Sequence, residues 1–406
     1  MDDSEIPLGA TLKRFRLEAG FTQRQLADRS GVSLSLIRAL EQGQRQTAQI
    51  GSIQALAKAL DRQIDELLRK AQALPGESPD AGIVAIRRVL TSVDDLIDEV
   101  VDDDLEPVSL LDTSRATTYA WGCYWGGKYD ELSRLLAQAM VRGRAAEHAS
   151  SAHERAAAVD QLAQLQQIAA CTLVHLGHPD TAWLASLEAR KTSERGDDPL
   201  RVAALRGTVS WLLLTQGRYE ESRKVAAKTA EKIDVTGKVT PAALSVYGNL
   251  LLSAATATGR DIELKDDRAR QAEDFLIEAR ETAERTGERK DYEAPFGREQ
   301  VTMQTADVHV VTERFGSALE TAKLMPRATR LPLAARMRHL TDVAHAQTQL
   351  GMNKKAVNTV LSIAASAPDW VRHQSLYKQT VAELDGRQPP TKLHELAVSI
   401  GAKRTR

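Results

Sequence analysis

Histidine and cysteine side chains are the first candidates for chemistry in this chain of 406 residues. His148 and His153 lie close enough in the sequence to suggest a metal site, and so do His175 and His178. Neither pair has a third ligand at a suitable spacing, and the His-Glu-x-x-His pattern of zinc enzymes is absent. We therefore interpret these histidines as surface or groove residues and predict no metal site.

The remaining reactive groups do not form a catalytic set either. Cys123 and Cys171 lie in apolar helical contexts, which favours structural thiols over a disulfide or a redox switch. The sequence has no Gly-rich phosphate-binding loop and no nucleophile elbow. An enzyme is therefore not expected, and no cofactor is predicted.

Recognition by surface side chains is better supported, in the run from Thr22 to Gly43. The run reads as a helix, a sharp turn and a second helix. Thr22 and Ser33 are suitable N-caps, while Gly31 and Gly43 can adopt the positive φ that ends a helix. Leu26, Ile37 and Leu40 are expected to face inward. Ala27 is small enough to let two helices cross closely over a short turn.

The spacing of Ala27, Gly31 and Ile37, together with Gln23 and the ending Glu41-Gln42-Gly43, resembles the helix-turn-helix of the lambda-repressor/Cro-like (XRE) family. The resemblance covers about residues 9–70 and implies a head of five short helices. The first would run from Gly9 to Gly20, the fourth from Ser52, and the fifth from about Gln63 to Lys70. Thr47 stands where relatives usually have proline, which leaves the path of that loop over the DNA backbone open.

In this family the N-terminal residues of the second helix of the motif enter the major groove. The resemblance implies that the base-reading positions are Ser33, Leu34, Ser35, Arg38 and Ala39. Leu34 and Ala39 suit thymine methyl groups, Ser35 offers a hydroxyl, and Arg38 suits guanine or phosphate. Because this face carries no Asn or Gln, we expect much of the specificity to come from DNA shape.

The same resemblance implies a set of phosphate contacts, namely Thr22, Gln23, Arg24, Gln44 and Arg45. Arg16 and Glu41 match a pair that bridges the first helix to the recognition helix in relatives, and solvent exposure is the alternative for either. Residues 9–70 carry eleven Lys and Arg against six Asp and Glu, whereas the whole chain has a net charge of −1. A basic head on an acidic body suits DNA binding. One head reads few base pairs, so we expect a homodimer on an inverted repeat of double-stranded operator DNA.

Composition sets the fold class. Hydrophobic residues make up 42% of the chain and charged residues 27%, but only 4% are aromatic, and Ala and Leu dominate. This balance favours an all-α protein. No apolar stretch approaches the ~18 residues that a membrane span needs, and the acidic start is unlike a signal peptide. We expect a cytoplasmic protein without a membrane partner.

We predict three parts: the head over residues 1–74, a linker and connecting helix over 75–106, and a helical domain over 107–406. The boundary is marked by two prolines and a glycine between Leu74 and Pro79, and a helix is expected from Ala81 to about Val101. Eight acids and no base lie between Asp94 and Glu106. This acidic segment reads as a solvated face and loop, or as a segment that contacts the basic head in one state.

From about residue 107, amphipathic helices alternate with short turns that contain glycine. These glycines are expected at 127, 177, 217, 259, 316 and 351, in steps of a size that suits helix pairs. The pattern resembles a degenerate tetratricopeptide-repeat solenoid, and a non-repeating helical bundle is the alternative. The segment from Phe296 to Thr312 breaks its apolar stripe with polar residues.

A solenoid of helix pairs forms a concave groove that binds peptides or small ligands. Joined to an XRE head, it resembles the peptide-responsive RRNPP regulators and large XRE regulators of actinobacteria, which implies a peptide or small-molecule signal that shifts the spacing of two heads. The candidate groove residues are Asn249, Glu299, Gln300, Asp307, Arg336, His339 and Asp342. Two alternatives remain: a body that serves only for dimerisation or protein docking, and a head that docks a protein instead of DNA.

Overall fold

The computed structural model describes residues 9, 12–13, 15–16, 21–43, 45, 50–60, 79–92, 109–265, 267–387 and 391–402. Within these residues every regular element is a helix, and an isolated β-bridge joins Arg289 to Phe296. The predicted all-α class is therefore confirmed. None of the described helices is long and apolar enough to cross a bilayer. The chain divides into two compact units, Met1–Ala81 and Gly82–Arg406, which we call the head and the body.

The head contains α2 (Gln23–Ser30), α3 (Leu34–Glu41) and α4 (Ile50–Ala59). Thr22 caps α2 through a reciprocal pair of hydrogen bonds with Gln25, and Ser33 caps α3. Gly31 ends α2 at a φ of 70°, where its N–H donates to the carbonyl of Ala27. The predicted helix-turn-helix and its caps are confirmed, because local chemistry specifies them.

A small apolar core holds the head together. Its fully buried side chains include Leu12, Leu26, Ile37 and Leu40, with Leu56 from α4 beside them. Gly9, Leu12, Lys13, Phe15 and Arg16 are helical, as expected for the first helix. α4 starts two residues before the predicted Ser52. The expected fifth helix over 63–70, Thr47, Gly20 and the acidic segment 94–106 lie outside the described residues.

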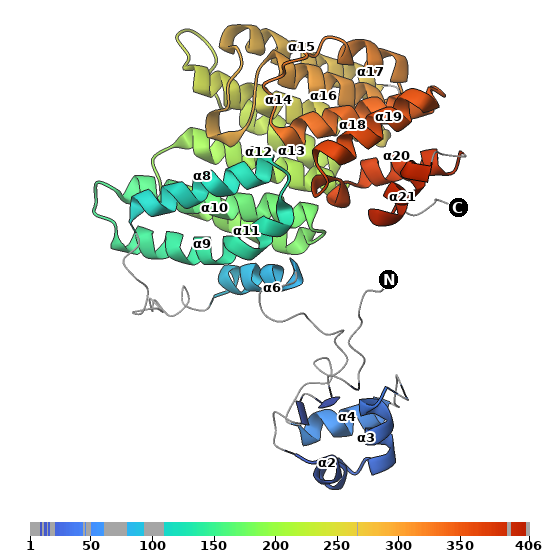
Figure 1. Cartoon of the computed structure of the whole chain (residues 1–406). Coiled ribbons are helices and arrows are strands. Elements are labelled where there is room, and N and C mark those ends of the chain that lie inside the picture. The colour runs from blue at the N-terminus through green and yellow to red at the C-terminus, as the bar shows by residue number, and fades with distance from the viewer. Residues whose placement is uncertain are drawn as a thin grey trace. The chain divides into compact units, whose positions relative to one another are not determined.

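The body is a succession of helix pairs (Figure 1). Its helices are α6 (Pro79–Leu90), α8 (Leu110–Trp125), α9 (Tyr129–Ala149), α10 (Arg155–His175), α11 (Pro179–Ser193), α12 (Pro199–Thr215), α13 (Tyr219–Ala230), α14 (Pro241–Arg260), α15 (Asp267–Thr286), α16 (Arg298–Val311), α17 (Phe315–Ala322), α18 (Leu333–Gln349), α19 (Asn353–Ser366), α20 (Ser375–Asp385) and α21 (Thr391–Ser399). Short 3-10 helices are η1 (Ile262–Leu264), η2 (Asp291–Glu293) and η3 (Trp370–His373). From α8 onward each helix contacts the next, and each even-numbered helix contacts the next even-numbered one. The even-numbered helices thus form one layer and the odd-numbered helices another, as in a helical-repeat solenoid.

One turn geometry recurs between the paired helices. Gly127, Gly177, Gly217 and Gly351 have φ between 71° and 83°, and the N–H of the next residue donates to a carbonyl five positions back. This is the Schellman arrangement that glycine favours. Glu313 adopts the same conformation, with a φ of 60°, before α17. The predicted turn glycines 259 and 316 are therefore wrong, because both lie inside helices.

The position of Gly259 has a different physical reason. A Cβ added there would lie 3.3 Å from Val311 and 3.4 Å from Val308, so the glycine allows α14 to pack closely against α16. Helix packing and turn formation both select small residues, and the sequence pattern does not separate them.

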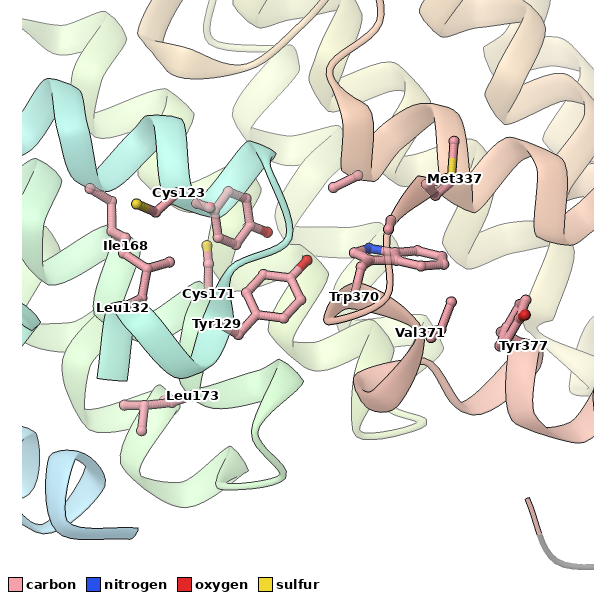
Figure 2. Close-up of a cluster of buried hydrophobic side chains, with 14 of the residues drawn as sticks. Cys123, Tyr129, Leu132, Ile168, Cys171, Leu173, Met337, Trp370, Val371 and Tyr377 are labelled. Carbon is pink, nitrogen blue, oxygen red and sulfur yellow. The ribbon is translucent and has the colours of Figure 1, made fainter. Parts of the chain in front are cut away.

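The body also closes on itself, because α8 contacts α18. Trp370 of η3 packs against the turn before α9, where a Cβ on Gly127 would lie 2.7 Å from the Cβ of Trp370. Figure 2 shows Tyr129, at the start of α9, with its hydroxyl directed toward Trp370. His373 Nε2 lies 3.3 Å from Asp130 Oδ1, and Gln374 lies 3.4 Å from His175. The first and sixth even-numbered helices of the solenoid therefore share one core.

The expected connecting helix is α6, and it belongs to the body. Ile83 and Ile86 are buried in the same core as α9 and α10. Gly82 lies against the carbonyl of Ser133, and Arg87 donates to Thr181 of α11. The helix ends at Leu90, whereas the sequence predicted an end near Val101.

Candidate functional sites in the head and the body

The predicted base-reading residues lie together on the surface of α3. Ser33, Ser35 and Arg38 are exposed, while Leu34 and Ala39 are half-buried. Ile37 and Leu40, on the other side of the helix, are fully buried. The guanidinium of Arg38 has no hydrogen bond or ion pair within the described part of the head. The hydroxyls of Ser33 and Ser35 lie 3.2 Å apart, and one of them donates to the other. This face can therefore donate to a ligand through the Arg38 guanidinium and through the second serine hydroxyl.

Three of the predicted phosphate contacts, Thr22, Gln23 and Arg24, lie at the start of α2, and Arg45 follows α3. Thr22 and Arg24 are exposed, and so is Arg45. Gln23 is half-buried, and its amide donates to Glu41 Oε2 at 2.7 Å, which leaves one amide hydrogen for another acceptor. Gln44 lies outside the described residues.

A buried cluster of Arg16, Gln23 and Glu41 joins α3 to the first helix and to α2. Arg16 Nε donates to Glu41 Oε1 at 2.7 Å, and Arg16 Nη2 donates to Glu41 Oε2 at 2.9 Å. Arg16 Nη1 also donates to the carbonyl of Phe21. Burial opposes ionisation of Glu41, but the hydrogen bonds from Arg16 and Gln23 outweigh it and lower the pKa of this carboxyl. The expected bridge between Arg16 and Glu41 is confirmed.

The body contains a cavity of about 300 Å³. Its wall comes mainly from the even-numbered helices α8 to α18. The loop before α16, η3, the first residue of α9 and Gln374 before α20 add further residues. Four of the five tryptophans of the chain line it, although aromatic residues are scarce. They are joined by three tyrosines; the aromatic lining is Trp121, Tyr124, Trp125, Tyr129, Trp211, Tyr292 and Trp370.

Ring contacts fix much of this lining. Tyr129 stacks on His175 with ring centroids 4.2 Å apart, and Tyr124 meets Trp125 edge-on at 5.1 Å. Trp121 Nε1 donates to Gln164 at 3.0 Å. Burial lowers the pKa of His175 to about 3, with a further contribution from His373, so the imidazole is neutral near pH 7. The aromatic wall is therefore preformed and carries no charge from His175.

A loop between α15 and α16 covers part of the cavity. Tyr292 and Glu293 both adopt positive φ, of 52° and 60°, which is unfavourable for residues with a Cβ. Three contacts hold the loop: Trp125 Nε1 donates to the carbonyl of Glu293 at 3.0 Å, Tyr292 Oη donates to Asp198 at 2.8 Å, and the guanidinium of Arg201 lies 4.8 Å from the Tyr292 ring centroid.

Charged side chains gather at the α14–α16–α18 side of the wall. Arg260 binds Asp307 with two hydrogen bonds, of 2.8 Å and 2.6 Å, and Arg338 Nη2 donates to Asp307 Oδ1 at 3.1 Å. Burial alone would raise the pKa of Asp307, but Arg260 and Arg338 outweigh it and lower the pKa to about 2. Asp307 is therefore a fully paired anion.

Asp342 is placed differently. Its side chain is 1% exposed, and neither carboxylate oxygen has a hydrogen-bond partner among the described residues. Arg338 Nε is 3.8 Å from Asp342 Oδ1, which is an ion-pair distance but too long for a hydrogen bond. Burial, together with the negative charge of Asp307, raises the pKa of Asp342 to about 7 in spite of Arg338 and Arg260.

Four of the seven predicted groove residues line the cavity: Asn249, Gln300, Asp307 and Asp342. Glu299, Arg336 and His339 do not. Glu299 instead accepts hydrogen bonds from Thr329 Oγ1 and the N–H of Arg330. His339 is buried, and burial lowers its pKa to about 4. Arg336 is exposed, because the cavity face of α18 repeats at 335, 338 and 342, so Arg338 is the arginine on the wall.

The sequence interpretation missed the aromatic residues of the wall. A usable signal was present, since most tryptophans of an aromatic-poor chain fall in the turns and even-numbered helices of the body. Cys123 and Cys171 are buried and unpaired with each other, and burial raises the pKa of Cys171 to about 12. Within the described ranges, no three His, Cys, Asp or Glu side chains converge as a metal site requires.

Residues 7–69 match a family model described as a helix-turn-helix domain, which identifies the head as such a domain. Among solved structures, the chain is similar to PlcR of Bacillus thuringiensis, which was crystallised in complex with the peptide PapR7 and DNA. The identity is 12% and the TM-score 0.38, over 87% of this chain and 98% of that one. No curated protein sequence matches this chain.

Proposed function

We propose that this protein is a sequence-specific, DNA-binding transcriptional regulator that binds an inverted-repeat operator as a homodimer, and that a peptide or small-molecule ligand in the body cavity controls its DNA affinity. The observation that carries the proposal is the exposed face of α3. Arg38 lies on it unpaired within the described residues, next to Leu34 and Ala39, on a helix that the Arg16–Glu41 cluster holds in place.

Readout by this face relies on few direct hydrogen bonds. Arg38 is placed to reach guanine or phosphate, and Leu34 and Ala39 are placed to contact thymine methyl groups. Arg24 and Arg45 are the exposed cations for backbone phosphates. Since one head provides so little base-specific chemistry, DNA shape and the spacing of two heads supply the rest of the specificity.

The cavity supports ligand control. It is preformed, it is lined by aromatic side chains, and its wall includes six helices of the repeat layer. A ligand that prefers one arrangement of the dimer by about 1–3 kcal/mol changes operator affinity by about 5- to 150-fold.

Operator selection from genomic fragments, followed by gel shift with the selected duplex, tests DNA binding. Arg38→Ala is expected to lose about 1–3 kcal/mol of binding free energy and with it the specific complex. Arg270→Ala, which removes an exposed arginine from α15 in the body, is the matched control and is expected to bind as the wild type does. Unchanged operator binding by Arg38→Ala, or no enriched fragment, would contradict the proposal.

Ligand control is tested on the same duplex. Native mass spectrometry of the protein purified from its own host identifies any small molecule that it carries. Protein stripped of that molecule and protein reloaded with it are then compared by gel shift. Equal operator affinity in the two states would reduce the body to a dimerisation scaffold.

A further inference from the structure

The cavity wall contains more buried acceptors than donors to satisfy them. Asp342 has two carboxylate oxygens without a partner, and Gln300 Oε1 and Gln167 Oε1 are also buried and unpaired among the described residues. The amide nitrogen of Gln167 donates to Thr208 at 2.8 Å, so the acceptor oxygen is the part left over. Buried acceptors without a donor are rare in folded proteins, and each calls for a partner.

The two arginines nearest to Asp342 donate mainly to Asp307. Both Nη atoms of Arg260 bind Asp307, and Arg338 Nη2 binds the same carboxylate. Arg338 Nε has no hydrogen bond and lies 3.8 Å from Asp342 Oδ1. Arg338 Nε therefore lies near the Asp342 carboxylate but too far away to donate a hydrogen bond to it. Asp342 is the anion of this cluster that lacks a hydrogen-bond donor.

Aromatic faces surround the remainder of the cavity. Trp121, Tyr124, Trp125, Trp211 and Trp370 line it. Ring contacts join Tyr124 to Trp121 and to Trp125, and Trp125 also donates to the carbonyl of Glu293. Rings of this kind bind flat or alicyclic apolar groups, and their electron-rich faces also attract organic cations.

We propose that the cavity binds a compact organic cation, a protonated amine on an aromatic or alicyclic framework, with the ammonium group at Asp342 and the framework among the tryptophans. The identification deepens the proposed function, on which its regulatory meaning rests, by naming the chemical class of the signal. An ammonium group supplies up to three N–H donors and no acceptor, which complements the unpaired oxygens of the wall. The volume of about 300 Å³ suits a small molecule.

Ligands of other charge fit the wall less well. A carboxylate would lie against the negative charges of Asp307 and Asp342, and the nearest arginines already bind Asp307. A neutral hydroxyl compound would add no positive charge beside an ionised Asp342, whose nearest cation, Arg338, is shared with Asp307. The same framework should therefore bind in the order amine, then alcohol, then carboxylate.

Matched sets of small probes test this order. Phenyl, naphthyl and cyclohexyl frameworks are each offered as the ethylamine, the ethanol and the propanoate, and isothermal titration calorimetry is carried out on the full chain. At least one amine is expected to saturate and to bind about tenfold more tightly than its alcohol and its carboxylate. Asp342→Asn keeps the side-chain shape and is expected to lose that tenfold preference while binding the alcohol unchanged. Asp274→Asn, an exposed carboxylate on α15, is the matched control and keeps the preference.

Three results would overturn the proposal: no amine in any set that saturates, equal affinity across the three charges in every set, or an amine preference that survives Asp342→Asn. Urea unfolding followed by tryptophan fluorescence shows that the variant is folded, because all five tryptophans lie in the body. The operator gel shift is a separate measurement. Operator binding without amine selectivity refutes this inference alone, and amine binding without any effect on the operator refutes ligand control alone.

Discussion

The head and the body each contain a buried cluster of arginine and carboxylate that joins helices distant in sequence. In the head, Glu41 accepts two bonds from Arg16 and one from Gln23, so both of its oxygens are satisfied. In the body, Asp307 is satisfied in the same way by two arginines, while Asp342 shares one of those arginines and accepts no hydrogen bond from the described residues.

The difference separates two uses of buried charge. A carboxylate whose oxygens are all bonded is a structural brace, and removing its partner leaves a stranded charge. A carboxylate that stays buried without a donor makes the folded protein less stable than it could be. Sites that bind ligands often keep such unfavourable groups, because the ligand supplies the missing partner. By this criterion Glu41 and Asp307 are braces and Asp342 is a binding group.

The largest expected effect comes from breaking the closed cluster of the head. Glu41→Ala leaves Arg16 buried without its anion and should destabilise the head by about 3–5 kcal/mol. Hydrogen-exchange mass spectrometry of the full chain measures this, since peptides from α2 to α4 report on the head alone. Asp28→Ala, an exposed acid on α2, should exchange as the wild type does. Full protection of α3 in Glu41→Ala would show that the cluster is dispensable.

Asp307→Asn breaks the closed half of the body cluster. The amide keeps the shape but leaves Arg260 and Arg338 facing a neutral group, and Arg338 is partly exposed, so we expect a loss of roughly 2–4 kcal/mol. Urea unfolding followed by tryptophan fluorescence measures the body, because the head has no tryptophan. An unchanged midpoint would show that Asp307 does not stabilise the body in the way proposed for Glu41 in the head.

Asp342→Asn should have the opposite sign. The folded-state pKa of about 7 lies above the ordinary value near 4, so the folded body binds this proton more tightly than the unfolded chain does, and the wild type loses stability as the pH rises from about 4 through 7. The asparagine does not titrate. The variant should therefore be more stable than the wild type by about 1–3 kcal/mol at pH 8, with little difference at pH 5.

The same urea experiment, repeated at the two pH values, gives the measurement. If the variant is less stable than the wild type at pH 8, the Asp342 carboxylate stabilises the body and the interpretation of Asp342 as a binding group is wrong.

The smallest expected effect is the pH dependence of amine binding. The carboxyl of Asp342 faces Asp307 from α16, Arg260 from α14 and Arg338 on its own helix, and its pKa of about 7 leaves it mostly protonated at pH 6. An ammonium group binds the ionised form, so the affinity of the best amine should be about tenfold higher at pH 8 than at pH 6. Calorimetry at the two pH values measures this, and Asp342→Asn should show a flat profile. A wild-type affinity that falls with pH would contradict the assignment.

Prediction from the sequence succeeded where the determinants are local. The caps Thr22 and Ser33, the turn at Gly31 and the inward Ile37 and Leu40 lie within one run of 22 residues, so short-range chemistry specifies them. In the body, the turns at Gly127 and Gly351 followed from the same logic. The turn at Glu313 did not, because an exposed glutamate there adopts the left-handed conformation that the sequence pattern assigns to glycine.

The cavity was only partly predictable, since its wall combines residues from 121 to 374. Interruptions of the apolar stripe pointed to Gln300, Asp307 and Asp342, which line the cavity. The same criterion selected Arg336 instead of Arg338, because a difference of two positions reverses the face of a helix and α18 has polar residues on both sides. Which helix faces which is a property of the assembled layers, and no local pattern contains it.

The contact of Trp370 with Gly127 changes the mechanics of the body. In an open array each repeat contacts only its neighbours, so strain at one repeat decreases along the chain. The contacts of α8 with α18 and of Gly127 with Trp370 join the first even-numbered helix to the sixth and close the array. In a closed array, strain at one helix is shared by the others. We therefore expect a change in the spacing of the even-numbered helices to tilt all of these helices together. This movement would also displace α6, which contacts α9 and α11 and follows the head in the sequence.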